Sequence, residues 1–153
     1  MRVHFFDSSA IAKRYVNEAG TAWILGLVGP TSGNHNYLAS ITAVEVVSAL
    51  TRQQRSGSLS GADAAAALAA FRHDFANEYR ILDISAAMID VAMDMAEKHA
   101  LRGYDAVQLA AALRVHSQSL ASGMTLTLVS ADLALNAAAV AEGLAVEDPN
   151  AHP

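Results

Sequence analysis

Four acidic residues stand where a strand is expected to end or a helix to begin, and side chains of this kind can bind a metal ion together. They are Asp7, Glu45, Asp105 and Asp132. Clustered carboxylates repel one another unless they are protonated or neutralised by a cation. Mg²⁺ and Mn²⁺ prefer oxygen ligands of this type. If the four side chains converge, they form a site for a hard divalent metal.

The elements that must position these acids follow from an alternation of short apolar runs with segments of helical periodicity. Strands are expected at 3–6, 37–40, 80–83, 125–129 and 144–146, and helices at 10–15, 21–28, 42–55, 61–78, 85–98, 104–116 and 132–142. Such alternation predicts a parallel sheet with helices on both faces. Ligands of such sheets bind beyond the carboxyl ends of the strands, where Asp7 and Asp132 are expected.

A simpler interpretation of the same acids is helix capping. Asp7, Asp105 and Asp132 all stand at expected helix N-termini, where aspartate is favoured as a cap and by the helix dipole. For any one of them alone, capping is the commoner role. Glu45 lies three residues after Thr42, so these two residues could form a capping box.

Size and composition are typical of one compact domain of 153 residues, 53% of them hydrophobic. No cysteine is present, which excludes disulfides and thiolate zinc sites and fits a reducing cytoplasm. The apolar stretch before Asp7 is too short for a signal peptide or a membrane span, so we expect a soluble, cytoplasmic protein. The formal net charge of −5 neither supports nor excludes RNA, because setting aside the four acids leaves 11 acidic against 10 basic residues.

Four segments resemble the motifs of PIN-domain toxins of the VapC type, in the order expected for that family. They read DSSAIAKRY with EAGT (7–15 and 18–21), EVVSALTR (45–52), LRGYDAVQLAAAL (101–113) and LVSADLALNAA (128–138). One short match occurs often by chance, whereas four blocks in order and at similar spacing form a strong joint signal. The resemblance spans nearly the whole chain.

This resemblance implies a three-layer α/β/α PIN-like fold with a central, mainly parallel sheet of four to five short strands. The domain would cover residues 1–148, with a short C-terminal tail at 149–153. The implied activity is metal-dependent endoribonuclease, the toxin of a toxin–antitoxin pair. Its catalytic and metal-binding residues would be Asp7, Glu45, Asp105 and Asp132, with Ser9 and Ser130 orienting the carboxylates or the metal-bound waters.

The implied reaction is hydrolysis of an RNA phosphodiester bond by a water activated on Mg²⁺ or Mn²⁺, which leaves a 5′-phosphate and a 3′-hydroxyl. No protein nucleophile is required, and neither Ser8 nor Ser9 has a histidine nearby in sequence to form a triad. The implied partners are the RNA substrate, a cognate antitoxin that masks the acidic groove, and a second copy in a homodimer. No membrane partner is expected.

Two features depart from the family pattern. The stretch between Asp105 and Asp132 is longer than usual, and no basic residue directly follows Asp132. These departures leave open how the substrate is held and whether Asn136 helps to complete the site. RNA phosphates could contact the cations Lys13, Arg14, Arg52 and Arg55, but a solvated surface position explains each of them equally well. RNA bases could stack on Tyr15, Trp23 and Tyr104, but aromatic residues at helical spacing more often belong to the core.

Three other functions are compared with this one. A PIN-like module could keep the fold and bind a partner without cutting RNA, although all four acids are present. A receiver-type phospho-switch shares the doubly wound fold, but it would need paired acids after the first strand and a lysine after the fifth. A phosphatase of the haloacid-dehalogenase type would need Asp-x-Asp, and position 9 is serine.

Overall fold

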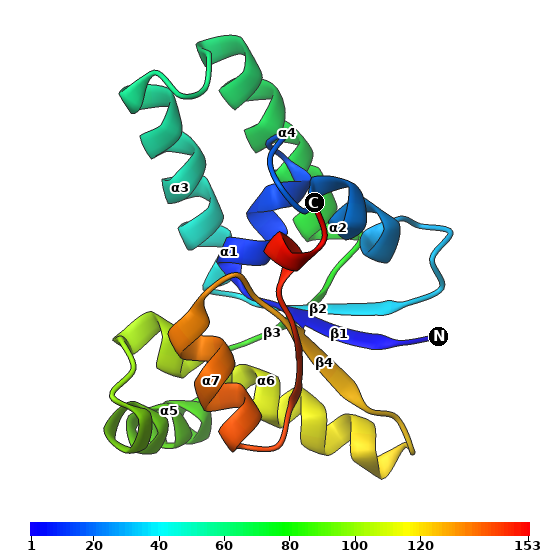
Figure 1. Cartoon of the computed structure of the whole chain (residues 1–153), viewed down its shortest axis with the longest axis vertical. Helices are drawn as coiled ribbons and strands as arrows, with labels where there is room; N and C mark the ends of the chain where they lie inside the picture. The colour runs from blue at the N-terminus through cyan, green and yellow to red at the C-terminus, as the bar shows by residue number, and fades with distance from the viewer.

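The computed structural model describes all 153 residues and contains one sheet of five parallel strands (Figure 1). The strands are β1 (Val3–Phe6), β2 (His35–Ala39), β3 (Arg80–Leu82), β4 (Leu126–Val129) and β5 (Ala145–Glu147). Their order is β3-β2-β1-β4-β5. Receiver domains have the order 2-1-3-4-5. The parallel sheet predicted from the sequence is confirmed, and the receiver alternative does not fit this topology.

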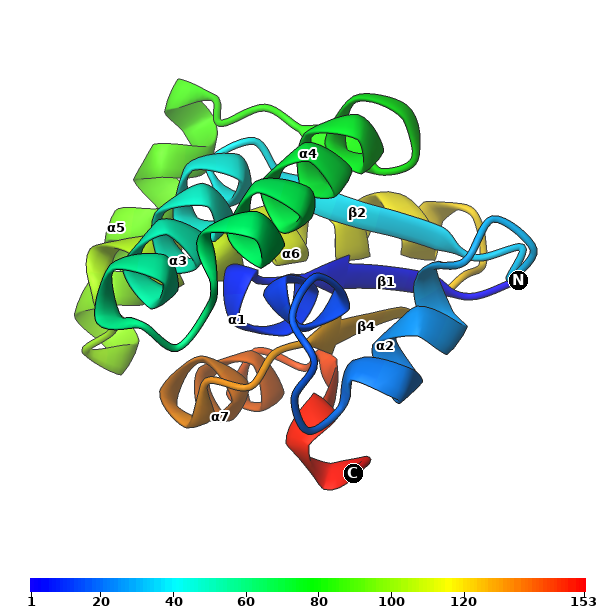
Figure 2. The ribbon, with the colours of Figure 1, turned by 90° about the horizontal axis from the view of Figure 1, so that it is seen from above.

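Helices cover both faces of the sheet, which gives the three-layer α/β/α arrangement (Figures 1 and 2). They are α1 (Ser8–Ile11), the 3-10 turn η1 (Ala12–Arg14), α2 (Thr21–Val28), α3 (Thr42–Ser56), α4 (Gly61–Asn77), α5 (Ala86–His99), α6 (Gly103–Ala121), α7 (Leu133–Ala141) and the 3-10 turn η2 (Pro149–Ala151). Helices α1 to α4 lie on one face and α5 to α7 on the other. None of the helices is both long and apolar enough to cross a membrane.

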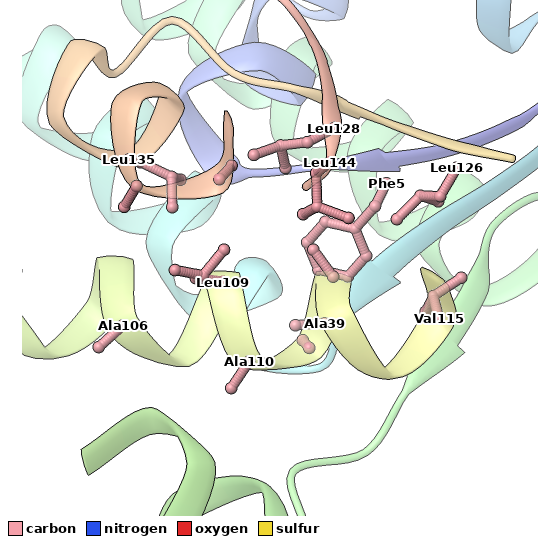
Figure 3. Close-up of a cluster of buried hydrophobic side chains, with 14 of the residues drawn as sticks. Phe5, Ala39, Ala106, Leu109, Ala110, Val115, Leu126, Leu128, Leu135 and Leu144 are labelled. Carbon is pink, nitrogen blue, oxygen red and sulfur yellow. The ribbon is translucent and has the colours of Figure 1, made fainter. Parts of the chain in front are cut away.

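The central strands are buried on both faces, and their side chains alternate between two hydrophobic clusters. Phe5 and Leu128 belong to the cluster under α5, α6 and α7, where they lie near Leu109 and Leu135 (Figure 3). Their chain neighbours Phe6 and Val129 belong to the cluster beneath α1 to α4. Successive side chains of a strand point to opposite faces, so the apolar runs VHFF and LTLV supply both clusters. Strands β1 and β4 are therefore fixed in position from both sides.

The start of α3 differs from the sequence prediction. Ile41 is the N-cap residue and makes no side-chain capping bond, while Thr42 is already helical and completely buried. The predicted capping box between Thr42 and Glu45 is therefore wrong. Its physical reason is that Thr42 Oγ1 accepts a hydrogen bond from Gln108 of α6 and Glu45 bonds to groups on other elements.

The last residues of the chain lie against α2. Gly20, which precedes α2, has φ +88°, and a Cβ there would overlap the backbone and side chain of Pro149. The ring of His152 stacks on Trp23 with centroids 4.1 Å apart and an interplanar angle of 4°. Residues 149–152 thus cover the side of α2 that would otherwise face solvent.

Candidate active site

The carboxyl ends of β1 and β4 bring Asp7 and Ser130 together. Phe6 pairs with Val129 in the parallel register, and the next residue on each strand is Asp7 or Ser130. The Asp7 N–H donates to the Val129 carbonyl at 3.2 Å. From β1 the chain continues to β2 on one side, whereas β4 lies on the other. This is a topological switch point, the place where parallel sheets of this kind bind ligands.

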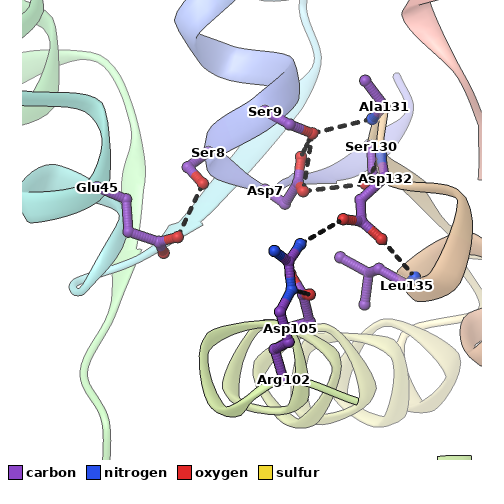
Figure 4. Close-up of polar contacts among 10 residues, drawn as sticks. All are labelled: Asp7, Ser8, Ser9, Glu45, Arg102, Asp105, Ser130, Ala131, Asp132 and Leu135. Carbon is purple, nitrogen blue, oxygen red and sulfur yellow. Dashed lines mark hydrogen bonds and ion pairs between the residues drawn. The ribbon is translucent and has the colours of Figure 1, made fainter. Parts of the chain in front are cut away.

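Asp7 is 3% exposed and is held by three donors. Ser9 Oγ donates to both carboxylate oxygens at 2.7 and 2.9 Å, and Ser130 Oγ donates to Oδ2 at 2.9 Å (Figure 4). The Ala10 N–H donates to Oδ1 at 3.0 Å. The bond from Ala10 caps α1, so the capping interpretation also holds for Asp7. The capping bond uses only Oδ1 of Asp7, and the carboxylate stays at the edge of the sheet.

Burial raises the pKa of Asp7 from 3.8 to about 7. The hydrogen bonds from Ser9, Ala10 and Ser130 oppose this rise, and the negative charge of Glu45 adds to it. The same two hydroxyls also join the loop after β4, since Ser9 Oγ accepts from the Ala131 N–H and Ser130 Oγ accepts from the Asp132 N–H, both at 3.0 Å. The predicted orienting residues, Ser9 and Ser130, therefore contact Asp7 directly.

Asp105 and Asp132 share one arginine. Asp132 caps α7 by accepting the Leu135 N–H on Oδ1 at 2.8 Å, and its Oδ2 lies 3.2 Å from a guanidinium nitrogen of Arg102. Asp105, in the first turn of α6, lies 3.3 Å from Nε of the same arginine. The Asp105 carboxylate does not cap α6, whose N-cap is Arg102.

Burial raises the pKa of Asp105, and the charge of Asp132 raises it further, while Arg102 lowers it. The two carboxylates are therefore close enough for their charges to repel each other. Arg102 offsets that repulsion from the solvent side, because its side chain is 82% exposed. A cation at this edge thus stabilises both ionised acids.

Glu45 lies at the same edge but apart from the other three acids (Figure 4). It is half-buried in the first turn of α3, where Oε2 accepts from Ser8 Oγ at 3.0 Å and Oε1 accepts from Gln108 Nε2 at 2.9 Å. Gln108 is 1% exposed, and its second N–H donates to Thr42 Oγ1 at 2.9 Å. Both oxygens of Glu45 are therefore directed by side chains from α1 and α6.

A hard metal fits the donor chemistry of this edge, because its four acids offer carboxylate oxygens and its serines offer hydroxyl oxygens. The four acids do not converge as the sequence predicts, since no three acidic or histidine side chains are positioned to hold one ion. Two contacts account for this: Arg102 lies between Asp105 and Asp132, and Asp132 Oδ1 is used as a helix cap. A metal held by both aspartates would take the place of Arg102.

Three contributors to this edge were not identified from the sequence: Ser8, Arg102 and Gln108. Arg102 and Gln108 each stand three residues from Asp105 in α6, on the neighbouring helix turn. Gln108 also interrupts an otherwise apolar run, AVQLAAA, which is a sign of a polar role inside the fold. Asn136, left open by the sequence, donates to the Ser130 carbonyl at 2.8 Å and so supports the loop rather than the carboxylates.

No protein-family model and no curated protein matches this chain. Solved structures do match over almost the full length. PAE2754 from Pyrobaculum aerophilum is 20% identical with a TM-score of 0.64, covering 98% of this chain and 91% of that one. VapC20 from Mycobacterium tuberculosis, described as a sarcin-ricin loop cleaving toxin, is 19% identical with a TM-score of 0.62, covering 98% and 99%. A toxin–antitoxin complex from Klebsiella pneumoniae is 15% identical with a TM-score of 0.60, covering 95% and 97%.

At these identities the likeness concerns the fold. The chain has the three-layer PIN-like fold that the motifs of the sequence predict, and the matched structures include proteins of toxin–antitoxin pairs. The predicted fold class is confirmed.

Proposed function

We propose that this chain is a metal-dependent endoribonuclease of the VapC type, the toxin of a cytoplasmic toxin–antitoxin pair. The observation that carries the proposal is the buried Asp7 at the switch point between β1 and β4, hydrogen-bonded into one network with the loop that carries Asp132. The fold shared with VapC20 supports the same activity. Burying a carboxylate next to other acids is unfavourable unless a ligand at that place compensates for it.

Each residue of the edge has a role in this proposal. Ser9 and Ser130 hold the oxygens of Asp7 in fixed directions, and Ser8 and Gln108 do the same for Glu45. Asp105 and Asp132 complete the ligand set. When bound at these carboxylates, Mg²⁺ or Mn²⁺ supplies an activated water and stabilises the negative charge on the leaving oxygen.

RNA cleavage by the purified chain tests the proposal. Total RNA is incubated with Mg²⁺ or Mn²⁺, with EDTA, and with the variants Asp7→Ala and Asp105→Ala after circular dichroism has shown that both are folded. Asp94→Ala, which removes an exposed acid of α5 with no partner in the chain, is the matched control. We expect cleavage with metal by the wild type and by Asp94→Ala, and none with EDTA or with either site variant.

Two outcomes would contradict the proposal. Cleavage that persists in Asp7→Ala and Asp105→Ala would place the activity elsewhere or in a contaminant. Folded wild-type protein that cuts no RNA with either metal would favour the alternative of a silent PIN-like binding module. The geometry gives that alternative one supporting observation, the absence of three acids around a common point.

A cognate antitoxin is the proposed protein partner. The matched complex from Klebsiella pneumoniae supports such a pairing. An arginine or lysine from the partner would occupy the acidic edge as Arg102 does within the chain. Expression of the wild-type chain alone should arrest bacterial growth, expression of Asp105→Ala should not, and equal growth of the two cultures would refute a toxic ribonuclease.

A homodimer is the proposed assembly. The outer side of α5 exposes Ile89 (41%) and Met93 (59%), which stand one helical turn apart. Contiguous exposed apolar side chains on one helix face can form a contact with another chain. Light scattering should give twice the mass of the chain for the wild type and a lower mass for Ile89→Asp, whereas a monomeric wild type would exclude the assembly.

A further inference from the structure

A cleft of about 440 Å³ lies beside Glu45, and the proposed reaction gives no role to most of the residues that line it. It is bounded by α1, α3 and the first turn of α6. Its walls are formed by Ser8, Ser9, Ala12, Glu18, Val44, Glu45, Ser48, Ala49, Arg52, Gln53 and Tyr104. Serine hydroxyls and alanine methyl groups make up about half of this lining, which contains a single aromatic ring and a single cation. Clefts of this size accommodate small organic groups.

Tyr104 supplies the aromatic ring, and it is 57% exposed. The Tyr104 hydroxyl makes no hydrogen bond within the chain, and Tyr104 directly precedes Asp105. The other two aromatic residues considered for base stacking are engaged elsewhere. The hydroxyl of Tyr15 bonds to Asp74 and Tyr79, and the ring of Trp23 stacks on His152. Tyr104 is thus the one of the three whose ring is free at the cleft.

Arg52 supplies the cation, and it has no acidic partner in the chain. Arg14, by contrast, is neutralised by Asp74 and Glu78 at 3.2 and 2.8 Å. Lys13 is 6% exposed and lies 3.5 Å from Glu18, the second acid of the cleft. Of the cations that border the Asp7 and Glu45 helices, Arg52 is therefore the unpaired one that lines this cleft.

The spacing along α3 relates the cation to the acids. Arg52 follows Glu45 by seven residues, two helical turns, so both face the cleft and are about 10 Å apart along the helix axis. A phosphate on Arg52 would then be a different one from the phosphate held at the acidic edge.

We propose that this cleft is the subsite for one nucleotide of single-stranded RNA next to the scissile phosphate. The base stacks on Tyr104, and a flanking phosphate pairs with Arg52. The inference rests on the proposed ribonuclease function and adds to it the two side chains that hold the nucleotide next to the cut, because an unpaired base can leave its neighbours to stack on a protein ring. Stacking is tolerant of sequence, so Tyr104 holds this nucleotide whatever its base.

Binding and single-turnover cleavage together test the subsite. Binding of a labelled, randomised RNA hexamer is followed by fluorescence anisotropy in EDTA, and cleavage of the same RNA with Mn²⁺ is measured over a range of protein concentrations. Tyr104→Ala should weaken binding about 5- to 150-fold, the range expected for one stacked base. The maximal cleavage rate at saturating protein should fall much less than the affinity does. Tyr104→Phe should recover most of the affinity that Tyr104→Ala loses.

Arg52→Gln has a matched control in Arg55→Gln, which removes an exposed cation one turn further along α3 and outside the cleft. Arg52→Gln should weaken binding and lower the salt dependence of log Kd by about one, as for one lost phosphate contact. Arg55→Gln should change neither. Equal effects of the two substitutions would show a diffuse charge effect and overturn the assignment of Arg52.

The outcomes separate this inference from the proposed function. RNA that is cut with metal, but with the same affinity in Tyr104→Ala and Arg52→Gln, overturns the subsite and leaves the ribonuclease. RNA that is bound in a Tyr104-dependent manner but never cut supports the subsite and refutes the ribonuclease. Duplex RNA that binds as tightly as the single strand, or RNA that is neither bound nor cut, overturns the subsite.

Discussion

Replacing Asp7 with asparagine should stabilise the metal-free protein at alkaline pH, although it removes a proposed catalytic group. Asp7 is 3% exposed, and burial together with the charge of Glu45 places its pKa at about 7. In the unfolded chain the same carboxyl has its ordinary value of 3.8. The folded state therefore disfavours the ionised form, and Asp7→Asn removes that ionisation while keeping the size and one acceptor oxygen of the side chain.

The magnitude follows from the difference between the two pKa values. One pKa unit corresponds to about 1.4 kcal/mol, so ionised Asp7 costs the folded chain about 4 kcal/mol. Asparagine weakens the bonds from Ser9 and Ser130, a loss of about 1–2 kcal/mol. The net gain at pH 8 is about 2 kcal/mol, which corresponds to a rise in Tm of about 5 °C for a chain of this size.

The difference in stability between Asp7→Asn and the wild type depends on pH. Because the folded-state pKa lies above the unfolded-state value, the penalty is absent below about pH 4, grows as the pH rises, and is complete above about pH 7. Thermal unfolding in EDTA should therefore show Asp7→Asn more stable than the wild type at pH 8 and no more stable at pH 4. Asp94→Asn, which removes an exposed charge, should show no such change with pH.

Adding Mn²⁺ at pH 8 extends the same experiment. A ligand at 100 times its Kd stabilises the folded state by about 2.7 kcal/mol, so the wild type should gain several degrees and Asp7→Asn should gain less. A difference in Tm between variant and wild type that is the same at pH 4 and pH 8 would refute the reasoning about burial. Equal gains with Mn²⁺ would refute Asp7 as a metal ligand.

Three further predictions concern the supports of the site and of the fold. Gln108→Leu should lower the cleavage rate at least tenfold, because it removes the hydrogen bond that directs Oε1 of Glu45. Thr42→Val removes only the bond from the Gln108 amide to Thr42, so it should reduce thermal stability and leave the cleavage rate near that of the wild type. Arg102→Ala should tighten Mn²⁺ binding about fivefold by calorimetry, because the guanidinium competes with the metal for Asp105 and Asp132. A unit charge at contact distance in high dielectric is worth about 1 kcal/mol. Weaker Mn²⁺ binding by the variant would contradict this competition. Gly20→Ala should lower Tm by more than Gly57→Ala, because both residues have positive φ but only the first lies against another segment, and equal losses would show that the contact is unimportant.

The fold was predictable because its elements are marked locally. The run VHFF ends at an aspartate and two serines, and the β-branched and apolar run before Ser130 stands between turn residues, so both central strands were found to within a residue or two. The end of α6 was placed too early, at His116 instead of Ala121. The helix continues through polar residues because its buried face continues with Val115 and Ser119. The Ser119 hydroxyl is accommodated there by donating to the Val115 carbonyl at 2.8 Å, an interaction that sequence periodicity does not reveal.

The site was predictable to the extent that it depends on strand ends. Asp7 and Ser130 meet because β1 and β4 are neighbours, and any parallel sheet with that pairing brings them together. The position of Glu45 depends instead on how α3 approaches α6. A local capping box with Thr42 and a distant bond to Gln108 compete for the same side chains, and tertiary contact wins because Thr42 is completely buried and needs a partner inside the fold.

Arg102 shows why the acidic edge and a net charge of −5 are compatible in a chain proposed to bind RNA. Without a metal, its guanidinium pairs with both Asp105 and Asp132 and offsets part of their charge. Burial, and to a smaller extent the charge of Asp132, raises the pKa of Asp105. An ion pair of an arginine that is 82% exposed contributes at most about 1 kcal/mol, so a divalent ion bound as proposed would displace it at little cost. Under the proposed function, the released guanidinium would stay at the edge of the site and face the phosphates of the substrate instead of the acids. The same residue would then pair with the acids in the metal-free chain and add a positive charge to the proposed RNA-binding surface once the metal is bound.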